Sequence, residues 1–472
     1  MFIGRKRELQ SLEEQYNKPG FAMTVIYGRR RIGKSTLITK FISGKKAIFY
    51  TAAKVGAGRN LELFSKEVIS AVDSSYARAS FTGLEDVFDF LTEKLTDEKT
   101  VLVIDELPYW AEKDEALLSV LQRYIDNKWQ EKNLFIILCG SSLSFMELKV
   151  LSEKSPLFGR RSSQIKLDAF NYIDAAGFVP GYTNEEKAIC YGITGGVAKY
   201  LSMIDNAKSL DDNIKRLFFS KDGYLYDETK NLLTQEFTDI TLVNNIIEQI
   251  AAGENTLNTI ADKVREKPTT VLYSLERLIE VGLVERRCCI TEEHNKKKSQ
   301  YVLKDSMFKF WYTFIPKALS VIEMEHGDLY YDNVVKPMLH SFMGSVFEEM
   351  CRYYTLEKGI MGAYGSFLTN AGSWWGTEII TDETKKKTIQ TADIDIVALS
   401  DIDKTAVLGE CKFKNEKTGM DVYEALVRRT RLISDKYRVT KLLLFSLSGY
   451  TDWYKTVHDD RLICYTLDDI YG

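Results

Sequence analysis

The sequence has few of the residues from which metal and disulfide sites are usually built. Its 472 residues include only four histidines, scattered at His294, His326, His340 and His458. This scatter argues against a histidine-based metal site and against a Ser-His-Asp triad. The seven cysteines include no Cys-x-x-Cys pair, so neither a zinc site nor a disulfide framework is expected. We therefore expect a reducing, cytoplasmic setting.

Long apolar runs are also absent. No run of about 18 apolar residues exists, so we expect no segment that spans a membrane. The first residues, Met1–Gly4, lack the basic-then-apolar order of a signal peptide. The net charge of −4 excludes a generally basic nucleic-acid coat but leaves room for a local basic face. With 45% hydrophobic residues, the chain is expected to form about two to four globular domains.

A glycine-bounded loop near the N-terminus carries the clearest chemical signal. The segment Gly28–Ser35 reads GRRRIGKS, follows the apolar run Met23–Tyr27 and leads into a helical pattern that starts at Thr36. Strand, loop and helix in this order, with the spacing G-x-x-x-x-G-K-[ST], are typical of a phosphate-binding loop. The alternative is a glycine-containing loop that arose by chance. Such a loop would not be expected to lie between a strand and a helix, as this one does.

Each residue type that the loop motif requires has a chemical role in this interpretation. Gly28 and Gly33 would let the backbone turn tightly, so that successive N–H groups point at phosphate oxygens of ATP. Lys34 would bridge the β- and γ-phosphates, Ser35 would hold Mg²⁺, and Thr36 would continue the cradle at the helix N-terminus.

An acidic pair follows the next strongly apolar segment, Val101–Ile104. An apolar run of this kind predicts a strand buried in a parallel sheet, and ligands bind at the carboxyl ends of such strands. Asp105 would then hold Mg²⁺, and Glu106 would orient or deprotonate the attacking water. The alternative is a helix N-cap followed by an acidic residue in the first turn.

Two later segments add possible contacts to the nucleotide. The apolar strand Leu134–Cys139 ends in Gly140-Ser141-Ser142, and Ser142 could sense the γ-phosphate, or these serines could cap the next helix. The loop Ser155–Arg161 carries two arginines, of which Arg160 could stabilise phosphate charge in its own chain or in a neighbouring copy of a homo-oligomer. Both arginines could equally be ordinary surface residues.

As a set, these motifs resemble the archaeal-type AAA+ ATPases, which are close to the signal-transducing STAND NTPases. The matching segments are FIGRKREL (2–9), GRRRIGKS, VIDELPYW, CGSSLSFM and SPLFGRRS, and they run in family order through about residue 205. The resemblance implies an ATP-hydrolysing switch with ATP and Mg²⁺ as cofactors. Ala198 stands where the family has a proline, in the segment Gly195–Tyr200.

The middle of the chain predicts a winged helix, the layout of helix, turn, helix and β-hairpin. Helical patterns cover 242–252, 257–264 and 268–281, and strands at 283–287 and 300–303 would form the hairpin. In one interpretation the helix 268–281 enters a DNA groove and Lys296–Lys298 contact phosphate. In the other, the winged helix serves for packing or as a lid.

The last third alternates charged and apolar residues on two predicted strands. Asp393 and Asp395 would share one face of their strand, and Glu410 and Lys412 one face of theirs. If the faces meet, Asp395 and Glu410 can chelate Mg²⁺, with Glu348 from a preceding helix as a further ligand. Lys412 would orient a water or stabilise developing charge. The alternative is a solvated sheet face with alternating charges.

The order of these residues resembles the PD-(D/E)xK restriction-endonuclease-like fold. It also resembles the C-terminal domain of unknown function, DUF234, that is often fused to archaeal-type ATPases. The proline that precedes the first acidic residue in the nuclease family is absent here, where Ala392 or Ile394 stands.

Together the patterns predict an α/β protein with three domains. These are a P-loop ATPase domain with a parallel sheet (1–205), a helical and winged-helix domain (206–305), and a nuclease-like α/β domain (306–472) whose helical connector is 306–333. The expected function is an ATP switch that controls a DNA-binding, Mg²⁺-dependent DNA-cleaving domain. One alternative is a nucleotide-dependent interaction switch whose nuclease-like domain only binds DNA or a protein, and another is a chaperone-like or regulatory ATPase.

Overall fold

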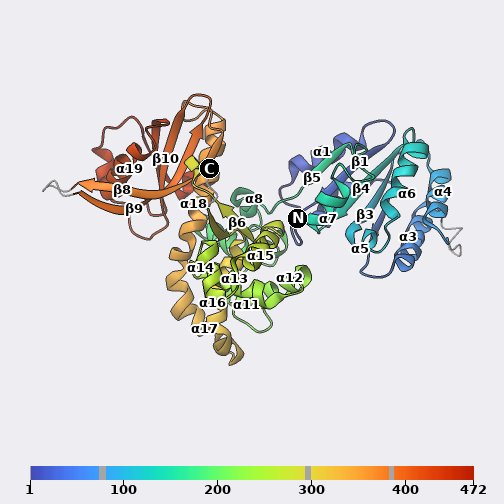
Figure 1. Ribbon diagram of the computed structural model, residues 1–472, viewed down its shortest axis with the longest axis horizontal. Helices are drawn as coiled ribbons and strands as arrows, with labels where there is room; N and C mark the ends of the chain where they lie inside the picture. The colour runs from blue at the N-terminus through green and yellow to red at the C-terminus, as the bar shows by residue number, and fades with distance from the viewer. Residues whose placement is uncertain (1, 74–80, 293–298, 382–386) are drawn as a thin grey trace. The chain divides into compact units, whose positions relative to one another are not determined.

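The computed structural model describes residues 2–73, 81–292, 299–381 and 387–472, and the chain forms two compact units (Figure 1). The first unit comprises the chain up to Phe170 together with Val197–Ser202, and the second comprises Asn171–Gly196 and Met203–Gly472. Most of the predicted first domain therefore forms the first unit, but residues 171–196 and 203–205 belong to the second. The predicted domains 206–305 and 306–472 lie together in the second unit.

A five-stranded parallel sheet forms the centre of the first unit. Its strand order is β2-β3-β4-β1-β5. The strands are β1 (Ala22–Tyr27), β2 (Ala47–Thr51), β3 (Thr100–Asp105), β4 (Leu134–Gly140) and β5 (Ser163–Lys166). Every residue of β1, β3 and β4 is buried, as expected for strands covered on both faces. This sheet confirms the prediction of a parallel α/β domain.

Helices cover both faces of this sheet because alternate strand residues point to opposite sides. On one side, Ala22, Ile26 and Val103 pack with residues of α1 (Lys6–Tyr16) and α2 (Lys34–Ile42). On the other side, side chains such as Val25 and Ile104 pack with four helices: α3 (Ala57–Val72), α4 (Leu84–Lys94), α5 (Leu107–Ala111) and α6 (Leu117–Tyr124). A π-helical turn, Ile125–Trp129, extends α6, and the short α7 (Leu143–Phe145) follows β4. The unit also includes α10 (Ala198–Leu201).

The second unit begins with helices and a small hairpin. The helices are α8 (Tyr172–Ala176), α9 (Asn184–Thr194), α11 (Leu210–Phe218), α12 (Glu228–Glu236), α13 (Ile240–Ala251), α14 (Leu257–Val264) and α15 (Pro268–Glu280). The strands β6 (Val284–Arg287) and β7 (Gln300–Leu303) then pair antiparallel. The predicted contacts of Lys296–Lys298 lie outside the described residues.

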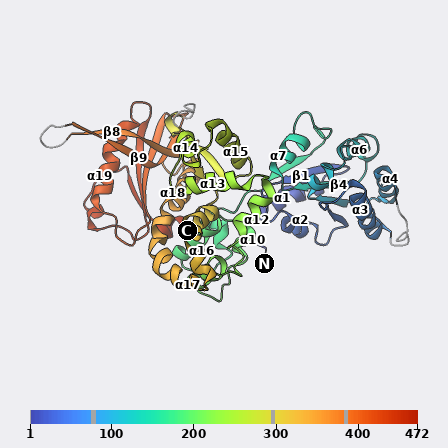
Figure 2. The same ribbon diagram turned by 60° about the horizontal axis from the view of Figure 1, so that its bottom comes forward.

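A mixed five-stranded sheet and a long helix complete the second unit. The sheet order is β12-β11-β10-β9-β8, with β8, β9 and β10 antiparallel and β10, β11 and β12 parallel. The strands are β8 (Asn370–Thr381), β9 (Lys387–Ser400), β10 (Thr405–Lys412), β11 (Arg438–Ser446) and β12 (Leu462–Thr466). Helices α16 (Ser306–Glu323) and α17 (Gly327–Tyr330) precede α18 (Lys336–Ile360), and α19 (Met420–Arg429) and α20 (Leu467–Tyr471) lie later in the chain. Both views show α18 running alongside the sheet (Figures 1 and 2).

The aromatic segment at the start of α16 belongs to the core, as its helical spacing suggests. Phe308, Phe310 and Phe314 are buried, and Phe310 packs against Phe342 of α18 with ring centroids 5.3 Å apart. In the described parts of the chain, no helix is long and apolar enough to cross a membrane.

A buried ion pair links α19 to β8, an edge strand of the mixed sheet. Glu378 of β8 is almost fully buried and accepts hydrogen bonds from Arg428 Nε at 3.0 Å and from Gln390 at 3.0 Å. The hydrogen bond from Arg428 lowers the pKa of the Glu378 carboxyl. The carboxylate therefore stabilises the fold once it is ionised.

The substitution Glu378→Gln tests this ion pair through the pH dependence of stability. Because the folded pKa lies below the unfolded value, the stabilisation is present above about pH 4.5 and is lost as the pH falls through the folded pKa. We expect Glu378→Gln to lower the free energy of unfolding at pH 7 by about 3 kcal/mol, the cost of breaking a buried pair. Urea unfolding at pH 7 and at acid pH measures it, with the exposed Glu416→Gln as control. Equal losses at both pH values would contradict the assignment.

Candidate functional site

The loop between β1 and α2 adopts a conformation that only glycine permits at two positions. Gly28 has φ 152°, and a Cβ there would lie 2.2 Å from the carbonyl oxygen of Leu167. Gly33 has φ 93° and is the N-cap of α2. The loop backbone can therefore approach a ligand closely, and the first N–H groups of α2, from Lys34 to Thr36, lie at the helix end that favours anions.

Lys34 is held inside the loop by backbone oxygens. Its Nζ donates to the carbonyl oxygens of Gly28 at 2.9 Å and Arg29 at 3.0 Å. Only 5% of the residue is exposed, and burial lowers the pKa of its ammonium, opposed by the nearby charges of Glu106 and Asp105. A phosphate anion is a stronger acceptor than a carbonyl oxygen, so it could replace these contacts.

Ser35 and Asp105 meet at the carboxyl ends of β1 and β3. The Ser35 hydroxyl donates to Asp105 Oδ2 at 2.7 Å, and only 3% of Asp105 is exposed to solvent. A hydroxyl and a carboxylate are hard oxygen donors of the kind that Mg²⁺ selects, and the cation keeps waters and phosphate oxygens as its other ligands. The pair thus fits the predicted magnesium site of a nucleotide complex.

A hydrogen bond from Ser141 holds the Glu106 carboxylate, whereas the sequence predicts Ser142 as the residue that contacts the nucleotide. Glu106 has φ 50°, a left-handed conformation, and its Oε2 accepts from the Ser141 hydroxyl at 2.7 Å. Ser142 instead caps α7 by accepting from the N–H of Phe145. The structure therefore places Ser141, and not Ser142, beside the predicted water-orienting carboxylate. Both serines follow β4, and only the direction of the backbone there distinguishes them.

Arg160 lies away from the loop, and this corrects the prediction that it contacts nucleotide bound to its own chain. It precedes β5, which runs parallel to β1, so it lies at the opposite edge of the sheet from Gly28–Ser35. Its Nε and an Nη atom pair with the two carboxylate oxygens of Asp126, each at 2.7 Å. A role of Arg160 in a neighbouring copy stays a prediction.

Arg5 supports the loop from the N-terminal segment. Its guanidinium donates to the carbonyl oxygens of Ile32 at 3.3 Å and Asp168 at 2.5 Å, and it lies 4.1 Å from the centre of the Phe170 ring. The sequence around Arg5 does not reveal this contact with the loop backbone, because Ile32 and Asp168 lie far from Arg5 in the chain.

A second polar cluster lies where β9, β10, α18 and α19 meet. Asp395 of β9 and Glu410 of β10 are 9% and 5% exposed, and Asp395 Oδ2 accepts from the N–H of Cys411 at 2.8 Å. Lys412 Nζ lies 3.2 Å from Glu410 Oε2. The structure therefore brings Asp395, Glu410 and Lys412 together as expected, whereas Asp393 is exposed, with 74% of its side chain accessible.

Two arginines that the sequence interpretation did not include complete this cluster. Arg429 of α19 pairs with Glu410 Oε1 at 2.8 Å and donates to the carbonyl oxygen of Asp393 at 2.7 Å. Arg352 of α18 donates to the carbonyl oxygen of Asp395 at 3.0 Å and lies 3.5 Å from Glu348 Oε2. They come from helices remote in sequence, so no local pattern could have placed them.

Burial and mutual repulsion dominate the electrostatics of the cluster. Burial and the charge of Asp395 raise the pKa of Glu410 to about 8, and the same two causes raise the pKa of Glu348. Burial opposes the charge of Lys412, but Glu410 and Asp395 raise its pKa. Glu348 thus belongs to the cluster as predicted.

The fit of a metal ion to this cluster rests on two carboxylates. Within the described ranges, no group of three or more His, Cys, Asp or Glu side chains is arranged so that it could hold a metal ion. Asp395 and Glu410 remain a pair in which the charge of Asp395 opposes the ionisation of Glu410, and a bound cation would relieve that opposition. Two carboxylates with waters suffice for Mg²⁺, so the pair is compatible with the predicted ion.

The substitution Gly28→Ala tests the need for glycine in the loop. The new Cβ would clash with the Leu167 carbonyl, so the loop must shift and we expect ATP affinity to fall at least about tenfold, or ~1.4 kcal/mol. Gly44→Ala is a matched control, since Gly44 also has a positive φ of 79° but nothing within 4 Å of a Cβ. Calorimetric titration with ATP measures both, and equal losses would attribute the effect to backbone strain alone.

The raised pKa of Glu410 predicts a stability that declines with pH. Between about pH 4.5 and 8 the folded protein retains a proton that the unfolded chain releases, so rising pH destabilises the fold. In metal-free buffer, we expect Glu410→Gln to reduce this decline by at least about 1 kcal/mol. Urea unfolding at both ends of that range measures it against Glu416→Gln. An unchanged pH dependence would show that Glu410 is ionised in the folded protein throughout.

Comparison with known proteins identifies the N-terminal and C-terminal parts. A family described as an ATPase domain predominantly from Archaea matches residues 2–204, and a family described as archaeal and bacterial proteins of unknown function matches residues 311–423. The predicted ATPase domain and its fusion to a DUF234 domain are thereby confirmed, and the chain is an ATPase.

Individual relatives agree with this assignment. An uncharacterized protein of Methanocaldococcus jannaschii is 32% identical over 439 residues, which are 92% of each chain. An uncharacterized ATP-binding protein of the same organism is 48% identical over 46 residues, 10% of this chain and 78% of its own. The solved structure of a Walker-type ATPase of Pyrococcus abyssi is similar in fold, with a TM-score of 0.50 and 20% identity over 66% of this chain and 96% of that one. The chain therefore belongs to the family of the full-length M. jannaschii relative, with an archaeal-type ATPase domain followed by a domain of unknown function.

Proposed function

We propose that the protein is an ATP-driven switch that controls Mg²⁺-dependent DNA cleavage by its C-terminal domain. The observation that carries the proposal is the pair of buried carboxylates, Asp395 and Glu410, on neighbouring strands with Lys412 beside them. The ATPase domain supplies the energy input, and the C-terminal carboxylates supply a second site suited to phosphate chemistry.

In the ATPase domain, each residue of the loop has a task that its present contacts support. Lys34 would exchange the carbonyl oxygens of Gly28 and Arg29 for phosphate oxygens. Ser35 and Asp105 would hold the magnesium ion of the nucleotide complex. Glu106 would orient the attacking water while Ser141 holds its Oε2, since a carboxylate has two oxygens with about four acceptor positions.

In the C-terminal domain, Asp395 and Glu410 would hold Mg²⁺, and Glu348 would have to move closer to act as a further ligand. A bound Mg²⁺ supplies positive charge that polarises a phosphodiester and acidifies water. Lys412, whose charge the two carboxylates favour, would orient the water or stabilise the developing negative charge. Arg429 would have to leave Glu410 Oε1, at 2.8 Å, for that oxygen to become a metal ligand.

The arrangement of secondary structure supports two finer assignments. The order α18, β8, β9, β10, α19, β11, with an acid on β9 and Glu-x-Lys on β10, supports a restriction-endonuclease-like fold. The succession α13, α14, α15 and the hairpin β6–β7 supports a winged helix that would contact DNA.

One observation favours a second function, a nucleotide-dependent interaction switch. Both oxygens of Glu410 already have cationic partners, Arg429 and Lys412, which a metal ion would have to displace. Under this alternative the C-terminal domain binds DNA or a protein partner and does not cut. Metal binding separates the two functions.

Asp395→Asn in the full-length protein tests the cleavage activity. With Mg²⁺ and ATP we expect cleavage to fall about 100-fold or more, the loss typical of removing one group that stabilises the transition state. Asp393→Asn is a matched control from the same strand face, and its exposed side chain predicts nearly unchanged cleavage. Gel assays on single-stranded, duplex and branched DNA measure this, and Lys34→Ala should remove the dependence on ATP.

The same assays distinguish the alternatives. Absence of cleavage on every DNA form, together with Mg²⁺ affinity that Asp395→Asn leaves unchanged, would replace the nuclease with the interaction switch. ATP turnover that rises with a protein partner and not with DNA would instead indicate a regulatory ATPase.

A further inference from the structure

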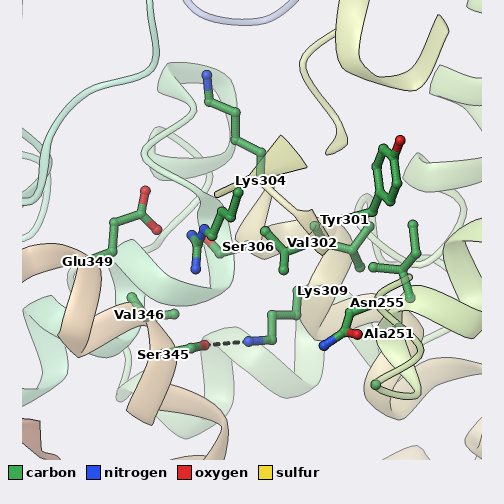
Figure 3. Close-up of a pocket in the computed structure, with 14 residues that line it drawn as sticks. Ala251, Asn255, Tyr301, Val302, Lys304, Ser306, Lys309, Ser345, Val346 and Glu349 are labelled. Carbon is green, nitrogen blue, oxygen red and sulfur yellow. Dashed lines mark hydrogen bonds between the residues drawn. The ribbon is translucent and has the colours of Figure 1, made fainter. Parts of the chain in front are cut away.

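A cavity of about 260 Å³ lies in the second unit (Figure 3). It is near the carboxylate cluster on one side, where Arg287 and Lys309 of its lining interact electrostatically with Glu348. Its walls come from the end of α13, the hairpin β6–β7, the first turns of α16 and the middle of α18. The ends of this lining, residues 250–255 and 345–349, are far apart in the chain and meet around one space, which the function proposed above does not use.

Three of the four charged side chains that line this cavity are cationic. Arg287 of β6, Lys304 after β7 and Lys309 of α16 contribute positive charges, and Glu349 of α18 is the one carboxylate among the lining residues that the structure describes. Lys304 and Glu349 are exposed, whereas Arg287 and Lys309 are half-buried. The surplus of positive charge favours an anionic ligand.

Lys309 has a neutral partner where a buried ammonium usually has a carboxylate. Its Nζ donates to the hydroxyl of Ser345, as the dashed line in Figure 3 shows. It has no direct ion pair with a described residue. Burial lowers the pKa of its ammonium, and the charges of Glu348 and Glu349 oppose that shift from a longer distance. Arg287 is paired with Glu285 of its own strand, which leaves the remaining N–H groups of its planar guanidinium for another acceptor.

The neutral groups around the cavity are also hydrogen-bond donors. The hydroxyls of Ser306 and Ser345 line it, and Ser306 is the first residue of the 18-residue helix α16, whose N-terminal dipole favours negative charge. Arginine, lysine and hydroxyl groups converging at a helix start are a donor set suited to phosphate oxygens. Ligand pockets for drug-sized molecules have volumes of about 300–1,000 Å³, so this smaller cavity suits one phosphate group with part of its attached sugar.

We propose that this cavity binds a phosphate monoester, with Lys309 and Arg287 as its principal contacts. A monoester carries a charge of about −1.5 to −2 at pH 7, which matches the surplus of positive charge in the lining. The group could be presented by a free nucleoside monophosphate or by the phosphorylated end of a nucleic-acid strand. The inference goes beyond the proposed function, since binding here requires neither ATP hydrolysis nor DNA cleavage.

The test measures binding and not activity, so failure of one proposal leaves the other standing. Full-length Lys34→Ala protein, in which the ATP loop is weakened, is titrated in EDTA at constant ionic strength. The ligands are inorganic phosphate, AMP, and an oligonucleotide with either a 5′-phosphate or a 5′-hydroxyl. We expect Lys309→Met to weaken phosphate binding at least tenfold. Lys317→Met, a change of an exposed lysine on the same helix, should leave binding unchanged.

Two further variants keep the test decisive if Lys309→Met folds poorly. Lys309→Arg retains the charge and should retain binding, whereas Ser345→Asp places a carboxylate beside the ammonium and should abolish binding. A preference for the 5′-phosphorylated oligonucleotide over its 5′-hydroxyl form would assign the site to a strand end. Tighter binding of AMP, with no preference between the oligonucleotides, would assign it to a free nucleotide. Binding of no phosphate ligand, or binding that these variants leave unchanged, would overturn the proposal.

Discussion

The parallel pairing of β1, β3 and β4 is the constraint on which the ATP site depends. Tyr27 of β1 is in register with Gly140 of β4, and Ile104 of β3 with Leu138 of β4, so the three strands end at one edge. The phosphate loop follows β1, Asp105 is the last residue of β3, and Ser141 follows β4. These parts of the site therefore meet at that edge although they lie far apart in the sequence. Complete burial of the strands makes a slip in register costly, because it would expose apolar side chains on both faces.

Much of the ATP site could be predicted because its signals are local. The spacing of Gly28, Gly33 and Lys34, and an acid at the end of an apolar strand, report the chemistry within a few residues. The choice between Ser141 and Ser142 could not be predicted, because it depends on the backbone direction after β4. The predicted position of Arg160 was wrong for a related reason. The sequence identifies an arginine in the loop before β5, but it does not reveal at which edge of the sheet that loop lies.

The C-terminal cluster shows the same division between local and remote information. The two-residue period of a strand predicted that Asp395 lies on the same strand face as Asp393, and that Lys412 lies on the same strand face as Glu410. Arg352 and Arg429 come from helices on either side of the sheet segment in sequence. Only the folded chain reveals that Arg429 pairs with Glu410 and that Arg352 lies beside Glu348. The prediction therefore found the acidic groups and missed the cations, which decide whether the carboxylates are available to a metal.

The hydrogen bond between Glu106 and Ser141 has a consequence for how precisely the carboxylate is oriented. Oε2 accepts from the serine hydroxyl at 2.7 Å, and the backbone of Glu106 holds a left-handed φ of 50°. Because a carboxylate has two oxygens and about four acceptor positions, this contact leaves room for a water molecule as well. In the role proposed for it, the side chain would therefore lose little rotational freedom when it orients that water. A change at Ser141 would then alter the accuracy of the site while leaving every charge in place.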